Sequence, residues 1–269
     1  WGYLQCFSPA NEEVWRNDSL IFHHSISQAP DSTLWACARM QAGKRIPQYY
    51  PDMLAQLDPK TGKTLYTKRV DDILRANPTY DYSTQADRKY DPYHLNDVQP
   101  VPGDGPYWQA GDLFLSLRNV HAVLLYRPST NRILWANSSA WTLQHDVGFL
   151  DSTTITVMDN NRFPRNTRFT GRDRLSRIMC YDLARDSAWV HLPQVWQRHD
   201  AYTEVSGKAW VFPEAGLSAM ESTMQGRLLF HDHQRSTTYQ AGKRAADEEG
   251  KLQFTFWANL YPYGAWPAN

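Results

Sequence analysis

Short apolar runs, many of them rich in aromatic and β-branched residues, recur along the whole chain and are separated by polar turns. No long stretch shows the i, i+3, i+4, i+7 spacing of an amphipathic helix. The 11 tryptophans and 15 tyrosines also favour strands and supply large buried surfaces. The pattern therefore predicts an all-β protein.

The strand-like runs repeat in groups of four. Each of four segments begins with a run that contains a histidine and continues with three more runs, and four antiparallel strands per repeat are typical of β-propeller blades. The predicted blades span residues 20–69, 94–137, 142–192 and 199–258, and residues 1–16 resemble the outer two strands of a preceding blade. We therefore expect one propeller domain over residues 1–269, with a complete ring of about five to six blades. Such a ring closes either with sequence that precedes this chain, which we favour, or by pairing of its two ends.

Two local assignments complete this prediction. The fourth blade is expected to consist of strands at residues 199–205, 208–214, 226–231 and 252–258. A tight turn is expected at residues 58–63, because Pro59 presets one φ angle and Gly62 accepts a positive one.

Charge and cysteine content exclude several classes of function. The chain carries 28 basic and 28 acidic residues, so nothing attracts it in bulk to nucleic acid or to an anionic membrane. No apolar run is long enough for a helix to span a membrane. Cys6, Cys37 and Cys180 lack metal-ligand spacing. They allow at most one disulfide, and the alternative is three buried thiols.

Histidines occupy the same position in the first strand of every predicted blade. The first strand of a blade lines the channel of a propeller, so equivalent positions converge around its axis. The second strands of the first two blades end at Arg39 and Arg118, and Asp159 and Glu214 hold roughly that place in the last two. The four first-strand motifs are His23-His24-Ser25, His94-Leu95-Asn96-Asp97, Gln144-His145-Asp146 and Arg198-His199-Asp200.

These residue types suit the transfer of a sulfuryl or phosphoryl group. A neutral imidazole is a nucleophile and a general acid or base near neutral pH. The guanidinium of arginine matches the oxygens of sulfate or phosphate. Two other interpretations stay open: the histidines cap strand ends and satisfy buried backbone groups, or they bind a transition metal, which the nearby arginines would disfavour.

At these residues the chain resembles the arylsulfotransferase-like family of β-propellers, which works without the sulfate donor PAPS. The similarity is strongest over residues 93–160 and weaker over nearly the whole chain. The motifs that carry it are His23-His24, His94-Leu95-Asn96, Ser116-Leu117-Arg118-Asn119 and Gln144-His145-Asp146-Val147.

The resemblance implies that a sulfuryl group moves from an aryl sulfate ester to a histidine and then to a phenol. His145 matches the nucleophilic histidine of the family. His94, Asn96 and Arg118 match residues that hold the sulfate oxygens and stabilise the transition state. The resemblance implies no cofactor or metal, small aromatic sulfates and phenols as partners, and a periplasmic or extracellular protein, tethered to a membrane only through a segment outside this chain.

The remaining candidates have less defined roles. His24, or less favourably His23, matches a further active-site histidine. The repeat adds His23, His199 and Arg39 as substrate-binding candidates. A function of a different class stays open, in which a non-catalytic propeller binds a partner or an anionic ligand at its channel mouth.

Two insertions belong to this picture. Residues 162–177 hold six arginines, which are expected either to form a solvated face or to attract anionic substrates. Residues 73–93 are rich in tyrosine, which is expected to pack between blades or to stack on an aromatic ligand.

Overall fold

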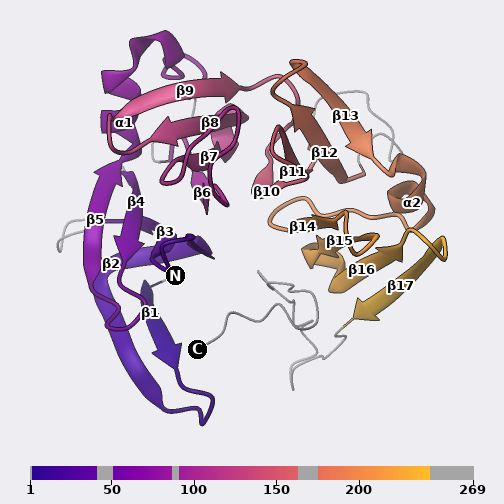
Figure 1. Ribbon diagram of the computed structural model, residues 1–269, viewed down its shortest axis with the longest axis horizontal. Coiled ribbons are helices and arrows are strands. Elements are labelled where there is room, and N and C mark those ends of the chain that lie inside the picture. The colour runs from indigo at the N-terminus through magenta and orange to yellow at the C-terminus, as the bar shows by residue number, and fades with distance from the viewer. Residues whose placement is uncertain (1, 41–50, 87–90, 163–174, 243–269) are drawn as a thin grey trace. The chain divides into compact units, whose positions relative to one another are not determined.

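A computed structural model describes residues 2–40, 51–86, 91–162 and 175–242. The chain divides into two compact units, residues 1–139 and 140–269. Each unit contains two antiparallel sheets, whose strands follow one another in sequence order (Figure 1).

The first unit holds a five-stranded and a four-stranded sheet. The strands of the five-stranded sheet are β1 (Gly2–Phe7), β2 (Glu13–Gln28), β3 (Leu34–Arg39), β4 (Asp52–Leu57) and β5 (Thr64–Arg69). The four-stranded sheet consists of β6 (Leu95–Pro100), β7 (Leu113–Leu117), β8 (Ala122–Arg127) and β9 (Arg132–Asn137). The apolar core of the first unit includes Leu54, Leu95, Leu115 and Tyr126, because strands of both sheets turn alternate apolar residues inward.

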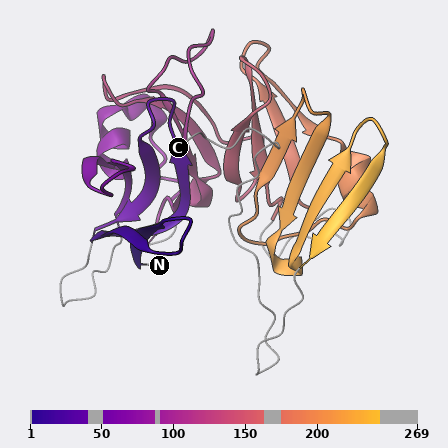
Figure 2. The ribbon, with the colours of Figure 1, turned by 60° about the horizontal axis from the view of Figure 1, so that its bottom comes forward.

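The second unit holds two four-stranded sheets. One consists of β10 (His145–Phe149), β11 (Thr154–Asp159), β12 (Arg177–Asp182) and β13 (Ser187–His191). The other consists of β14 (Ala209–Phe212), β15 (Leu217–Ser222), β16 (Arg227–Asp232) and β17 (Thr237–Gly242), which lie side by side in Figure 2. Met158, Ile178, Trp196 and Met220 belong to the core of this unit.

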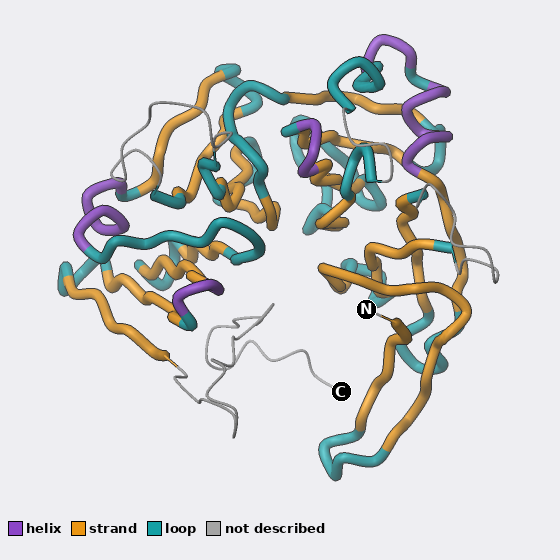
Figure 3. The backbone as a smooth tube through the Cα atoms, turned by 180° about the vertical axis from the view of Figure 1, so that it is seen from behind, coloured by secondary structure: helices purple, strands orange, loops and turns teal. Residues whose placement is uncertain are grey.

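Helices are few and short in the described part of the chain (Figure 3). They are α1 (Val70–Ala76), α2 (Pro193–Arg198) and the 3-10 turns η1 (Pro78–Tyr80), η2 (Arg118–Val120) and η4 (Thr223–Gln225). None of the helices in the described ranges has the length and apolar character needed to cross a membrane.

These sheets confirm the predicted fold class, an all-β propeller built of four-stranded antiparallel blades. The twelve strands predicted for the first three blades overlap β2 to β13. In the fourth blade, β14 and β16 overlap the predicted second and third strands, whereas β15 and β17 were not predicted. Residues 199–205 form no strand, and the blade begins at β14, within the run predicted as its second strand.

The composition of one strand and the backbone conformation of one loop explain why the fourth blade was predicted wrongly. The missed strand β15 has the sequence LSAMES, whose small polar residues give little strand signal, yet all but the first of its residues are buried between neighbouring strands. The predicted first strand follows α2, contains left-handed backbone at Asp200 (φ 46°) and is followed by left-handed Ser206 (φ 60°). The last predicted strand, residues 252–258, lies outside the described residues.

The N-terminal residues also differ from the prediction. Residues 2–16 belong to the first blade rather than to a preceding one, since β1 pairs with β2, which continues without a break into the first blade. The side chains of β2 attach it to the turn between β4 and β5: the Trp15 ring nitrogen donates a hydrogen bond to the Pro59 carbonyl at 2.8 Å, and the Asn17 amide donates one to the Gly62 carbonyl at 2.7 Å. These two bonds fold the N-terminal half of β2 onto its own blade.

The turn predicted at residues 58–63 is confirmed and is tightly packed. The Gly62 amide donates to the Asp58 carbonyl at 2.8 Å, and Gly62 has a φ of 68°. A Cβ atom at this position would lie 2.3 Å from the Trp15 ring. Only glycine therefore satisfies both the backbone conformation and the space left by the indole.

We predict that Gly62→Ala lowers the free energy of unfolding by about 1–3 kcal/mol, because the added methyl group needs the Trp15 ring to move while the backbone stays left-handed. Urea unfolding followed by tryptophan fluorescence measures this change. The matched control is Gly2→Ala, where a Cβ atom meets nothing within 4 Å. Equal stability of the two variants would contradict the packing described for the turn.

Candidate functional site

The polar motif of the first strand coincides with a β-bulge in three of the four blades. The pairing with the second strand shifts between His23 and Ile26, between Leu95 and Asp97, and between His145 and Val147. A bulge leaves extra residues unpaired and changes the direction of side chains, and bulges are frequent beside active sites. In the fourth blade, β14 and β15 pair without such a shift.

Left-handed backbone accompanies these bulges. His24 and Asp146 lie inside two of them with φ angles of 54° and 46°, and His94, directly before β6, has a φ of 55°. Residues other than glycine adopt this conformation at a cost of about 1–3 kcal/mol, and such residues cluster at functional sites. The strain is therefore placed on residues that carry the predicted chemistry.

In the first unit the bulges bring three imidazoles into a chain of contacts. The Nδ1 atoms of His23 and His24 lie 2.8 Å apart, and the Nε2 atoms of His24 and His94 lie 3.3 Å apart. The rings of each pair are packed edge to face. At the far end, His94 Nδ1 lies 2.5 Å from the Asp91 carboxylate. Because a carboxylate accepts, His94 donates its Nδ1 proton there.

A buried arginine fixes the carboxylate at the end of this chain. The Arg39 guanidinium lies 3.0 Å from Asp91 and donates through Nε to Asp52, also at 3.0 Å. Asp52 in turn accepts a hydrogen bond from the Leu95 amide at 2.9 Å. These contacts connect β3 and β4 to the start of β6, and they leave the Arg39 charge balanced by two carboxylates.

The electrostatics of the group keep His23 neutral. Burial lowers the pKa of His23 to about 3, and the positive charges of Arg39 and His94 add to the effect. Burial also raises the pKa of Asp52 to about 6, although Arg39 opposes the shift. At Asp91 burial is outweighed by the hydrogen bond and charge of His94 and by Arg39, so its pKa is lowered. Asp91 is therefore the stable anion of the group.

Arg118 and Asn96 lie beside these imidazoles in the same blade. The Arg118 amide donates to the His94 carbonyl at 3.1 Å, and the Arg118 guanidinium donates to the Asn119 side chain at 3.2 Å. The Asn119 amide nitrogen also donates to the Asp91 carbonyl at 2.6 Å. Asn96 is fully buried inside its bulge. The structure therefore brings His23, His24, His94, Arg39 and Arg118 into one connected group.

In the second unit His145 has a different partner. It is the first residue of β10 and only 1% exposed, and its Nδ1 atom lies 2.6 Å from Oδ1 of Asn160. Asn160 directly follows β11, and its side-chain nitrogen donates to the Thr203 and Ser206 carbonyls, each at 2.9 Å. Thr203 belongs to the residues that were predicted to be the first strand of the fourth blade, and Ser206 directly follows them.

Bulge residues also attach each blade to the next one within its unit. In the first unit the Ser25 hydroxyl accepts a hydrogen bond from the Val98 amide at 3.2 Å. In the second unit Asp146 accepts one from the Ala209 amide at 2.9 Å and lies 3.4 Å from the Lys208 ammonium. Burial raises the pKa of Asp146, and the Lys208 charge opposes this shift. The motif thus has an architectural role as well as a chemical one.

The ends of the second strands carry buried ion pairs. In the first blade Arg39 pairs with Asp52 across the sheet, and in the third blade Asp159 pairs with Arg177 at the equivalent register with the charges exchanged. Glu214 does not occupy this place in the fourth blade, because it lies in the turn between β14 and β15. In β15 the register-equivalent pair is Ser222 opposite Arg227, and the neighbouring Glu221, 1% exposed, faces Leu228.

His199 lies outside the first strands. It follows α2, and its carbonyl accepts a hydrogen bond from Arg227 at 3.0 Å. It is instead within electrostatic range of His231, which belongs to a second histidine group at β13, β16 and the turn after β16. There the Ser218 hydroxyl lies 2.8 Å from Nε2 of both His191 and His233, and the His231 ring lies 5.7 Å from that of His233.

The insertions have structural partners where they are described. Arg162 pairs with Glu204 at 2.6 Å and Arg177 with Asp159, whereas the other four arginines of residues 162–177 lie outside the described residues. Tyr82 is buried in the core of the first unit, which confirms packing for this tyrosine, and Tyr90 lies outside the described residues.

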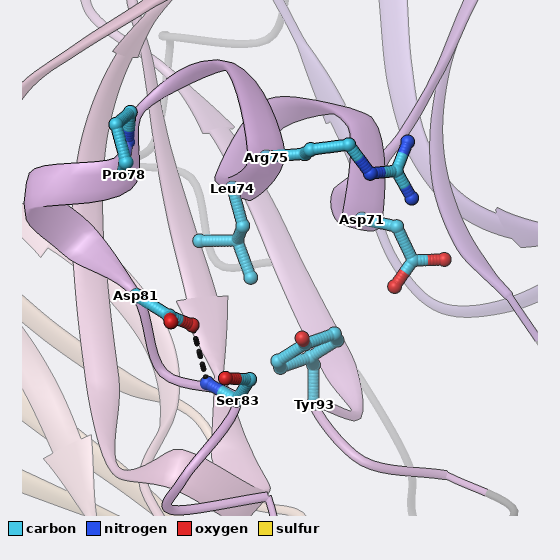
Figure 4. A pocket seen from close by; sticks show the side chains of 7 residues that line it. All are labelled: Asp71, Leu74, Arg75, Pro78, Asp81, Ser83 and Tyr93. Atoms are coloured by element: carbon cyan, nitrogen blue, oxygen red, sulfur yellow. Dashed lines mark hydrogen bonds between the residues drawn. The ribbon is translucent and has the colours of Figure 1, made fainter.

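The tyrosine-rich insertion also borders a cavity of about 320 Å³ (Figure 4). None of its lining residues is a predicted site residue. Asp71 pairs with Arg69 at 2.8 Å, and Asp81 accepts a hydrogen bond from the Ser83 amide at 2.8 Å. The residues that line it are Asp71, Leu74, Arg75, Pro78, Asp81, Ser83 and Tyr93.

Four residues with a clear role at the site were missed from the sequence: Asp52, Asp91, Asn119 and Asn160. Asp52 faces Arg39 across the ladder, so an opposite-charge pair between predicted strands was the available signal. Asp91 and Asn160 lie just outside strands, where no periodicity applies. Within the described ranges, no set of three or more His, Cys, Asp or Glu side chains is arranged to hold a metal ion. All three cysteines are free; Cys37 and Cys180 are buried, and Cys6 is half-buried.

Comparison with known proteins places these features in context. The family model described as arylsulfotransferase (ASST) matches residues 4–244 of the chain. A search among curated proteins gave no match. A Bacteroides caccae structure described as a protein of unknown function has a TM-score of 0.55 and 10% identity, and the similarity covers 89% of this chain and 74% of that one.

Two further solved structures are similar at low identity. Hydrazine synthase from Kuenenia stuttgartiensis has a TM-score of 0.51 and 11% identity over 86% of this chain and 59% of that chain. The WD40 repeats of RRP9 have a TM-score of 0.43 and 8% identity over 82% of this chain and 52% of that one. The chain thus spans less than two thirds of either structure. At 11% identity, the similarity to hydrazine synthase shows the fold alone.

The second histidine group predicts that acid destabilises the fold. Burial, with the charges of His233 and His231, lowers the pKa of His191 to about 4 from 6.5. The folded state therefore binds this proton less readily than the unfolded state. The stabilisation is complete above pH 6.5 and is lost as the pH falls towards 4.

Urea unfolding at a series of pH values checks this expectation. The free energy of unfolding should fall across this interval in the parent protein and fall less steeply in His191→Gln, which cannot take up the proton. An identical pH dependence in the two proteins would show that His191 does not titrate as described.

Proposed function

The chain belongs to the arylsulfotransferase family, and on that premise we propose that it moves a sulfuryl group from an aryl sulfate ester to a phenolic acceptor, with His145 as the carrier. The family supports a sulfotransferase-like function. The donor and acceptor classes and the histidine intermediate are our proposal, and they rest on the matching motifs and on the contacts of the imidazoles.

The proposed reaction has two balanced halves. In the first, a ring nitrogen of His145 attacks sulfur, an N–S bond forms, and the S–O bond to the aryl group breaks. The departing phenolate takes up a proton. In the second, the acceptor phenol attacks the same sulfur, gives up its proton, and the N–S bond breaks, which regenerates neutral His145. One sulfate ester and one phenol exchange the sulfuryl group, and no oxidant or reductant is needed.

The observation that carries the proposal is the chain of imidazoles from His23 through His24 to His94, which ends at Asp91. The reaction needs a proton delivered to one phenolate and removed from one phenol. Imidazoles in hydrogen-bond contact can pass a proton in either direction near neutral pH. Asp91 is the anion at one end of this chain, and His23 at the other end stays neutral near pH 7.

The two arginines receive different roles. Arg39 is held between Asp52 and Asp91, so we assign it to fixing Asp91 rather than to the sulfate. Arg118 is held through its backbone to His94 and through its guanidinium to a neutral side chain, Asn119. Its positive charge suits an oxyanion, and the family resemblance assigns it, with Asn96, to the sulfate oxygens.

Burial favours the alternative that these residues form a framework in a binding propeller. His145 is 1% exposed and Asn96 fully buried. In this case the bulges and imidazoles would hold blades together, and the protein would bind a partner or an anionic ligand without turnover. Assays on sulfate esters separate the two functions, since only the first predicts transfer. The resemblance further leads us to propose a periplasmic or extracellular site of action.

We predict that His145→Ala lowers the transfer of sulfate from p-nitrophenyl sulfate to phenol by at least about 1000-fold, because the carrier of the sulfuryl group is lost. Release of p-nitrophenol measures the rate. His231→Ala, which removes another buried histidine of the same unit outside the proposed site, should keep the parental rate. Undiminished turnover by folded His145→Ala would exclude this histidine as the carrier.

For Arg118→Ala we expect kcat/KM for p-nitrophenyl sulfate to fall about 100-fold or more, since a charged donor to the developing oxyanion is removed. The control is Arg185→Ala, whose side chain is 81% exposed and paired only with Asp182 among the described ion pairs. If both variants lost activity equally, the specific role of Arg118 would be contradicted.

A further inference from the structure

We propose that Asn160 is the positioning residue of His145: it fixes the imidazole in the tautomer with a proton on Nδ1 and thereby makes Nε2 the nucleophilic atom. The assignment of the tautomer follows from the structure of the second unit. Its importance for sulfuryl transfer rests on the function proposed above.

The orientation of the Asn160 amide is determined by two backbone carbonyls. The side-chain nitrogen lies 2.9 Å from the Thr203 oxygen and 2.9 Å from the Ser206 oxygen. Both of these oxygens can only accept, so the group that faces them must be the NH₂ group, which has two protons to donate. The reversed amide would place three oxygens against one another in a site where Asn160 is fully buried.

The fixed amide determines the proton on the ring. With its nitrogen committed to the carbonyls, Asn160 presents Oδ1 to His145 Nδ1 at 2.6 Å. An amide oxygen only accepts, so Nδ1 must carry the hydrogen of this bond. A neutral imidazole has one ring proton, and Nε2 is therefore left with its lone pair. A backbone loop thus specifies, through one side chain, which nitrogen can attack sulfur.

The loop that supplies the carbonyls is itself held in place. The Thr203 amide donates to the Ser176 hydroxyl at 2.9 Å, and the Thr203 hydroxyl donates to the Val205 carbonyl at 2.6 Å. Gly207 has a φ of 98°, and a Cβ atom there would lie 2.9 Å from both the Glu221 carbonyl and the Thr203 methyl group. The close approach of this loop to β15 therefore depends on glycine.

A merely structural amide and a positioning amide predict different consequences of substitution. If Asn160 only filled space, an apolar side chain of similar size would leave the ring proton of His145 where it is. If Asn160 sets the tautomer, this substitution frees Nδ1 from its acceptor and lets the proton move to Nε2, which removes the nucleophilic lone pair. A carboxylate keeps the acceptor and should keep the tautomer.

The test reads the tautomer directly, by two-bond ¹H–¹⁵N correlation spectra of protein labelled in its histidine rings, above the ordinary histidine pKa of about 6.5. The His145 signals are those absent from His145→Gln. We expect a protonated Nδ1 and a bare Nε2 in the parent and in Asn160→Asp, and a substantial Nε2-protonated population in Asn160→Leu. Ser206→Ala, which keeps the carbonyl, is the matched control with the parental spectrum.

Kinetics give a second readout. Asn160→Leu should lower kcat at least about tenfold with little change in KM, because substrate binding is retained while the reactive tautomer is depleted. If Asn160→Leu does not fold, Gly207→Ala displaces the carbonyls instead and should also raise the Nε2-protonated population. A protonated Nε2 in the parent protein, or an unchanged tautomer in both variants, would overturn the inference.

The inference and the proposed function fail separately. A bare Nε2 in the parent that is lost in Asn160→Leu supports the positioning role even if no sulfate ester is turned over. Conversely, loss of transfer in His145→Ala together with a parental tautomer in Asn160→Leu would leave the carrier role intact and remove Asn160 from it.

Discussion

The break in pairing between the first and second strands is the constraint on which the described site depends. At the same point of three blades, an extra length of chain leaves the ladder, and the unpaired residues are those with the chemistry: His24 in one bulge, Asn96 in the next and Asp146 in the third. A regular strand would turn these side chains alternately to its two faces. A bulge leaves such residues unpaired and changes the direction of their side chains.

The same bulges explain why so much charge is buried. Ser25 and Asp146 leave the ladder of their own blade and accept a hydrogen bond from the first strand of the next. Four carboxylates of these blades are paired with a cation: Asp52 and Asp91 with Arg39, Asp146 with Lys208, and Asp159 with Arg177. Removing one member of such a group leaves an unpaired buried charge. Function and stability therefore depend on the same contacts, and a variant at this site needs a separate measurement of folding.

The sequence was sufficient for the strands of the first three blades and for the histidine motifs beside their first strands, because apolar runs and repeated motifs are local signals. It failed for the fourth blade, where β15 is buried despite weak strand propensity. There, residues 199–205 form no strand, and the Thr203 carbonyl accepts a hydrogen bond from Asn160. Asp91 and Asn160 were missed for a related reason. Their importance comes mostly from partners distant in sequence, such as Arg39 for Asp91 and His145 for Asn160. Only His94 lies close to Asp91 in the sequence among the partners named here. Contacts of this kind follow from the fold and leave no periodic trace.

The central claim is that His145 carries the sulfuryl group, and the most direct test is the mass of the intermediate. The protein is mixed with p-nitrophenyl sulfate without an acceptor, quenched under alkaline conditions and digested. We expect one added sulfo group on the peptide that contains His145, its loss when phenol is supplied before the quench, and no such adduct in His145→Ala. A sulfo group on a different residue, or full turnover with no adduct on His145, would contradict the account.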